Sequence, residues 1–292
     1  MSINRSEIRK SALSLIYALL ENSNGESFDL DLFWDIAQEK KRDHYNEAHA
    51  KAVLHVCRAS ADSARLLNER AEALENAMHG DLTSAALREE VEHFVCRSAA
   101  FESAIAALNY SLHDKRREGT HQLALCTRDT LQLATALTAM GEDLLPRFAD
   151  FPAYVNYTEA MAAIIRRRGK LTAAVSELAE PANLRDSKEF AGLARMAGDL
   201  CELCPAVEEL AFGVIEHRAE LETELDSLIN NYTMERLDLV DRVILLIALY
   251  ELRISKLETA IVISEANLLA HTYSGSKSAP FIHGILAAAA KA

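Results

Sequence analysis

The stretch LDLVDRVILLIALYEL, residues 237–252, decides the fold of this chain. It begins as an amphipathic helix, because Leu237, Val240 and Ile244 fall on one helical stripe. Residues 243–250 are then apolar on every side, so this part of the helix has no face to give to water. The pattern predicts a central, nearly enclosed helix within an all-helical domain.

A carboxylate follows directly on the apolar run. Glu251 must find a hydrogen-bond donor or lie where the helix emerges into solvent, because an unpaired buried charge is costly. We expect the second arrangement, an exit to solvent.

Composition supports a largely helical protein. Half of the 292 residues are hydrophobic, and only 10 Gly and 5 Pro interrupt an Ala-, Leu- and Glu-rich chain. The formal charge of −13 argues against a protein that coats nucleic acid generally. A local RNA site remains compatible with it, because charges act over a Debye length of about 8 Å.

Compartment signals point to the cytoplasm. No apolar run approaches the roughly 18 residues that span a bilayer, and the N-terminus shows no signal-peptide pattern. Five scattered Cys suit reduced thiols. We therefore expect a cytoplasmic protein.

The chain changes character twice. Residues 3–21 and 28–38 predict two helices, and residues 186–292 predict a compact helical domain. Between them, residues 43–185 show long Ala-rich helical patterns, as antiparallel bundle helices do. We predict a discontinuous domain of residues 1–42 and 186–292, with an inserted bundle of unknown role at 43–185. The four bundle helices are expected at 44–79, 82–114, 120–149 and 152–180.

Two local signals are interpreted as helix boundaries. The cations Lys40, Lys41 and Arg42 would complement the dipole at a helix C-terminus. Pro205 would open a new helix at its first turn, after a helix over residues 187–203.

Five stretches resemble the family of the bacterial transcription antitermination factor NusB. They are IRKSALSLIY (8–17), LAFGVIEHRAELETELDSLI (210–229), MERLDLVDRVILLIALYEL (234–252), AIVISEANLLAHTY (260–273) and SKSAPFIHGIL (276–286). The resemblance implies two three-helix bundles packed across each other. It also implies binding to the single-stranded boxA element of ribosomal RNA transcripts, together with the small-subunit ribosomal protein NusE and the transcription elongation complex.

In the family, an arginine-rich first helix forms part of the RNA surface. The matching cations here are Arg5, Arg9 and Lys10, of which Arg5 and Arg9 share a helical face. Single-stranded RNA is held by such cations along its phosphates. We expect all three side chains to leave the apolar stripe and to bind RNA.

The loop before the last helix forms the rest of the family's RNA surface. Lys277 and Ser278 stand at a predicted helix N-terminus, where free backbone N–H groups favour an anion. Phe281 matches the family's aromatic residue, which can stack on an unpaired base. These three residues complete the predicted RNA-binding set.

The chain departs from the family pattern at several positions, each of which removes a donor or a permanent charge. Leu246 replaces an Arg, Ser264 an Asn, His271 a Lys and His283 an Asn. A second hypothesis is therefore a scaffold that kept the fold, lost RNA binding and acts through the inserted bundle. Its Ala-rich faces would allow close helix approach, including a homodimer.

Signals for a metal, redox or enzymatic site are weak. The pairs Glu90 with His93 and Glu118 with His121 have di-iron spacing, but such pairs arise by chance among ten His. Cys201 and Cys204 form a single CxxC, in which Cys204 could be a helix-start thiol of lowered pKa. With no phosphate-binding Gly loop or nucleophile elbow, we predict no enzyme, no cofactor and no metal.

Overall fold

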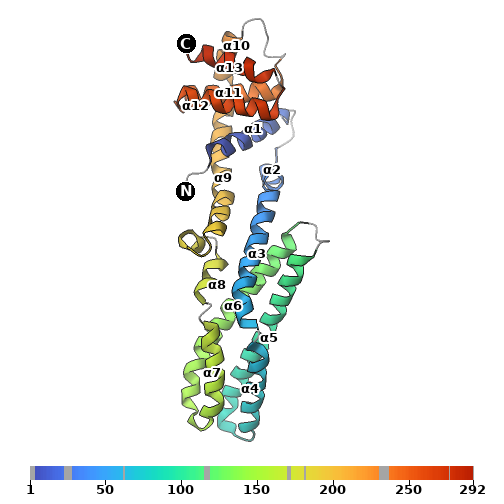
Figure 1. Cartoon of the computed structure of the whole chain (residues 1–292), viewed down its shortest axis with the longest axis vertical. Coiled ribbons are helices and arrows are strands. Elements are labelled where there is room, and N and C mark those ends of the chain that lie inside the picture. Colours follow the sequence, from blue (N-terminus) through green and yellow to red (C-terminus); the bar gives the residue numbers. More distant parts are fainter. Residues whose placement is uncertain are drawn as a thin grey trace. The chain divides into compact units, whose positions relative to one another are not determined.

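A computed structural model describes residues 4–22, 28–61, 63–114, 119–169, 172–180, 182–229, 237–275 and 277–291. Every regular element in these ranges is a helix, which confirms the all-α fold class. The chain divides into two compact units (Figure 1). Unit 1 comprises Met1–Glu39 and Asp199–Ala292, and unit 2 comprises Lys40–Gly198. The second limit falls inside a continuous helix rather than at residue 186.

Unit 1 is built around the apolar stretch. Its helices are α1 (Arg5–Glu21), α2 (Leu30–Ala37), the second half of α9 (Ala191–Glu216), α10 (Arg218–Leu228), α11 (Leu239–Arg253), α12 (Thr259–Tyr273) and α13 (Ser278–Ala289). Helix α11 packs against α1, α10, α12 and α13. Residues 243–249 are each at most 2% exposed, which confirms the prediction of an enclosed central helix.

Polar side chains begin three of these helices. Asn4 accepts from the Ser6 backbone N–H, and Asp238 accepts from that of Val240. Asp29 accepts from the Leu32 backbone N–H at the start of α2. Each cap satisfies a backbone donor that has no partner within its helix.

Unit 2 is a second all-helical body. Its elements are α3 (Glu39–Ala61), α4 (Ser63–Ala77), η1 (Leu82–Ser84), α5 (Ala85–His113), α6 (His121–Arg147), η2 (Phe148–Asp150), η3 (Pro152–Tyr154), α7 (Val155–Gly169), α8 (Thr172–Ala179), η4 (Asn183–Asp186) and the start of α9. The long helices α5 and α6 pack on each other. Helix α4 packs on α5 and α7, while α7 and α8 pack on α6.

Two of the predicted bundle helices, over 82–114 and 120–149, correspond to η1 with α5 and to α6 with the start of η2. The range 44–79 holds α4 and most of α3, which begins at Glu39, and the range 152–180 holds η3, α7 and α8. Residues 62, 170 and 171 lie outside the described residues. The last described turn of α7 carries Arg166, Arg167 and Arg168, whose charges complement the helix dipole there.

Both boundary interpretations were wrong. Helix α2 ends at Ala37 and α3 begins at Glu39, so Lys40, Lys41 and Arg42 lie in the first turn of α3 rather than at a C-terminus. Pro205 lies inside α9, which continues through it to Glu216. A proline removes one backbone donor from the helix, and packing of the flanking turns can outweigh that loss. The buried residues Leu203 and Val207 provide such packing.

Among the described helices, none combines the length and the apolar character that crossing a bilayer requires.

Candidate nucleic-acid interface

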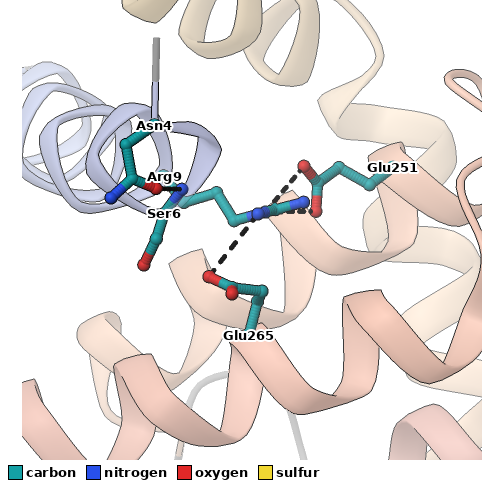
Figure 2. A network of polar contacts seen from close by, with 5 residues as sticks. All are labelled: Asn4, Ser6, Arg9, Glu251 and Glu265. Atoms are coloured by element: carbon teal, nitrogen blue, oxygen red, sulfur yellow. Dashed lines mark hydrogen bonds and ion pairs between the residues drawn. The ribbon is translucent and has the colours of Figure 1, made fainter. Parts of the chain in front are cut away.

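Arg9 is a buried residue. Its Nε lies 2.9 Å from both carboxylate oxygens of Glu251 on α11, and its Nη1 lies 3.5 Å from Glu265 on α12 (Figure 2). The side chains of Arg9 and Glu251 are only 3% and 8% exposed. This arrangement corrects two expectations, because Arg9 does not leave the apolar face of α1 and Glu251 does not exit to solvent.

The ion pair is held in a dry environment. Burial raises the pKa of the Glu251 carboxyl, while the hydrogen bonds and charge of Arg9 oppose that rise. The Arg9 Nη2 atom is buried without a hydrogen-bond partner. Arg9 therefore fastens α1 to α11 and α12, and its guanidinium is not presented to a phosphate.

The other two cations of α1 remain accessible. Arg5 is exposed and Lys10 is half-buried. Arg5 lies near enough to Glu251 for its charge to lower the pKa of that carboxyl slightly. The Arg9 anchor thus holds two neighbouring cations at the surface of unit 1.

The loop before α13 is tied to the start of α11 by a residue that sequence reasoning missed. Asp241 is 7% exposed and accepts hydrogen bonds from Ser274 Oγ at 2.6 Å and Ser278 Oγ at 2.8 Å. Ser274 Oγ and Ser278 Oγ are also 2.9 Å apart. The Ser278 hydroxyl is therefore occupied by Asp241. The four-residue spacing of the two serines is the only sequence signal that could have suggested this cluster.

The remaining two predicted residues lie in or next to the first turn of α13. Lys277 is exposed and stands at the N-cap position. Phe281 is half-buried and packs against the core of unit 1. A cation beside a helix N-terminus adds to the partial positive charge already present there.

The predicted residues thus form two groups on one body. One group is anchored at Glu251 and the other at Asp241, near opposite ends of α11, about 15 Å apart along its axis at the helical rise of about 1.5 Å per residue. The resemblance to the NusB family predicts that the two groups share one RNA surface, but it gives no distance between them. The buried carboxylates at the two ends of α11 fix that distance within unit 1.

The structure also shows the surroundings of the Glu-His pairs and of the CxxC pair, as far as they lie in the described part of the chain. Glu90 pairs with Arg147 there, and no cluster of three or more potential ligands occurs. Glu118 lies outside the described residues. Cys204 lies inside α9, and burial raises the pKa of its thiol. This corrects the hypothesis of a lowered pKa at a helix start.

The amino-acid sequence is similar to a known protein family and to several of its members. A model of the NusB family matches residues 199–291, which begin where the second segment of unit 1 begins. The transcription antitermination protein NusB of Methylacidiphilum infernorum is 32% identical over 103 residues, which cover 32% of this chain and 72% of that protein. The protein of the same name from Elusimicrobium minutum is 35% identical over 106 residues, covering 36% of this chain and 68% of that protein. The chain belongs to the NusB family.

The match to other NusB proteins is partial. The protein from Acidothermus cellulolyticus is 41% identical over 80 residues, but these cover 27% of this chain and 55% of that relative. The chain therefore spans about half the length of that NusB protein. No solved structure matches the chain. All of unit 2 precedes the residues matched by the family model.

Proposed function

We propose that this protein is a transcription antitermination factor of NusB type. In this proposal unit 1 is an RNA-binding domain that holds a boxA-like single-stranded RNA from a ribosomal RNA leader. It does so together with NusE, within the transcription elongation complex in the cytoplasm. Membership of the NusB family, and the antitermination name carried by the relatives, support the proposal.

The observation that carries the proposal is the exposed Lys277 directly before α13. Its ammonium group and the N-terminus of the helix favour the same phosphate. The Asp241 hydrogen bonds to Ser274 and Ser278 hold the chain on both sides of Lys277. Less conformational freedom is then lost when RNA binds, and this increases affinity.

Arg5 and Lys10 would extend the same surface. We propose that they bind further phosphates of the same strand, while Arg9 positions the helix that carries them. Phe281 would contribute an aromatic face at the edge of α13. The revised RNA-binding set is therefore Arg5, Lys10, Lys277 and Phe281, with Arg9 and Ser278 in supporting roles.

Titration of a labelled boxA-like RNA, with and without NusE, tests the proposal. The variant Arg5→Glu/Lys10→Glu/Lys277→Glu should lose RNA binding. Arg9 is left unchanged in this variant, because its removal would leave the buried Glu251 unpaired. A matched control, Lys51→Glu/Arg70→Glu/Arg97→Glu, makes the same charge change at exposed positions of unit 2.

Salt dependence adds a quantitative readout. Removing one ion pair between a cation and an RNA phosphate should lower the slope of log affinity against log salt by about 0.7 for a single strand. A single Lys277→Glu variant should show about one such step. The RNA proposal fails if the wild-type protein with NusE binds no RNA at low salt. It also fails if the unit 1 variant binds as well as the unit 2 control.

A further inference from the structure

A groove lies in unit 2 between helices α3, α6 and α8. Its volume is about 650 Å³, which falls within the range of about 300 to 1,000 Å³ typical of small-molecule sites. It belongs entirely to unit 2, and the RNA proposal for unit 1 makes no use of it.

The walls of the groove are mainly apolar. Leu131 of α6 is buried beneath it, and Ala136 and Ala179 leave space because they carry only a methyl group. Tyr45 and His49 of α3 line the other side, with their ring centroids 5.5 Å apart. The two neighbouring rings are tilted by 35° to each other, and their faces offer a surface against which an aromatic or aliphatic body can pack.

Hydrogen bonds at two points hold the groove open. His49 Nε2 lies 2.8 Å from the Leu178 carbonyl oxygen and ties α3 to α8. Asn46 Nδ2 donates to Thr120 Oγ1 at 2.8 Å, and the Thr120 hydroxyl donates to Asp43. These bonds tie α3 to the start of α6. The site is therefore pre-formed, and a ligand does not have to separate packed helices to enter it.

His49 contributes no charge at neutral pH. A carbonyl oxygen only accepts hydrogen bonds, so Nε2 carries the proton. Burial lowers the pKa of His49 below its ordinary value, and the ring is neutral with Nδ1 unprotonated. Among the described residues that line the groove, Arg128 alone then carries a charge at neutral pH.

We propose that this groove binds a small organic carboxylate with an apolar body. The body packs between Leu131 and the rings of Tyr45 and His49, and the carboxylate pairs with Arg128. A guanidinium group suits this partner because its planar fork matches the two oxygens of a carboxylate. The body is an aromatic or an aliphatic group, and the two are separated by experiment.

Calorimetric titration of the full chain with 2-naphthoate tests the site, and neutral 2-naphthamide serves as a shape-matched ligand without the charge. Decanoate replaces the aromatic body with an aliphatic one. We expect saturable binding of one or both acids, at least tenfold tighter than that of the amide. Amide resonances of Ala124, Leu131 and Ala136 should shift during the titration.

Two variants locate the binding. Arg128→Gln should weaken binding of the acid about tenfold and leave the amide unaffected, and Ala136→Phe should fill the groove and abolish binding of both. Arg97→Gln, an exposed cation of α5 outside the groove, is the matched control and should change nothing. If Ala136→Phe does not fold, Arg128→Lys should retain part of the preference for the acid.

Three results would overturn the proposal. They are the absence of saturable binding for both acids, equal saturable binding of naphthoate and naphthamide, and an Arg128→Gln variant that binds the acid as tightly as the wild type does, for whichever acid the wild type binds. RNA titration is independent of all of them, because the cations proposed for RNA lie in unit 1.

Discussion

Arg9 on α1 and Glu251 on α11 are separated by 242 positions in the chain, yet Arg9 Nε donates to both oxygens of the Glu251 carboxylate at 2.9 Å. The pair joins the first helix of the chain to the central helix of the C-terminal segment (Figure 2). Its burial makes it a structural element of unit 1, and its removal should destabilise that unit as a whole.

Replacing Arg9 with Met should destabilise unit 1 by about 3–5 kcal/mol, because it leaves a buried carboxylate unpaired. Urea unfolding followed by fluorescence of Trp34, the only Trp of the chain, reports on this unit. The double variant Arg9→Met/Glu251→Leu should recover most of the stability, since no charge is then left buried. An Arg9→Met protein as stable as the wild type would show that the pair is not buried in solution.

Gly213 of α9 leaves room for the side chain of Tyr250 on α11. A Cβ atom added there would lie 2.7 Å from Tyr250 Cζ. Gly213→Ala should therefore destabilise unit 1 by about 1–3 kcal/mol through overpacking. Trp34 fluorescence in urea again measures the effect.

Gly284→Ala is the control for this change, because it lies inside helix α13 of the same unit and a Cβ atom there meets nothing within 4 Å. It should stabilise the helix by up to about 1 kcal/mol, since Ala is the better helix former. Equal effects of the two alanines would contradict the close approach of Tyr250 to Gly213. Combining Gly213→Ala with Tyr250→Leu should cost less than the two single changes added together.

Asp241 should control the order of the loop before α13. Asp241→Ala removes the acceptor shared by Ser274 and Ser278, at a cost of about 1–3 kcal/mol for buried groups left without a partner. Hydrogen exchange at the Ser278 amide, which donates to the Gly275 carbonyl at 3.0 Å, should become faster. The exposed Asp226 provides a control, and its replacement by Ala should leave that amide unchanged.

Unit 2 should lose stability on acidification through His49. The pKa of His49 is lowered in the folded protein, so between that value and 6.5 the unfolded chain binds more protons. Stability therefore rises as the pH increases through this window and falls as the pH decreases through it. His49→Gln, which can still donate to the Leu178 carbonyl, should flatten this dependence in urea unfolding followed by circular dichroism. His44→Gln, at an exposed position, should preserve it.

Sequence reasoning identified the features that depend on local pattern. The uninterrupted apolar character of residues 243–250 was enough to predict an enclosed helix, since no rotation of such a helix gives it a polar face. The same kind of evidence predicted the all-helical fold. Whether the cations of α1 and Lys277 bind RNA stays a prediction.

The environment of each charged side chain was decided by tertiary structure. Arg9 and Arg5 share a helical face, but Arg9 meets Glu251 and Glu265 while Arg5 stays at the surface. Likewise, Asp241 is buried because two serines more than thirty residues later donate to it. Helical periodicity states which residues lie on one side of a helix and carries no information about distant partners.

By itself, the sequence determined that unit 1 folds around residues 243–250, because apolar side chains leave water whatever their partners are. Only the tertiary structure decided which cations remain accessible. It also decided that α9 continues through Pro205 and that α3, α6 and α8 line a groove. These features depend on contacts between distant segments. The free energy of burying a charged side chain is set by the groups that surround it in the folded protein, and the space between helices is set by the side chains that pack there.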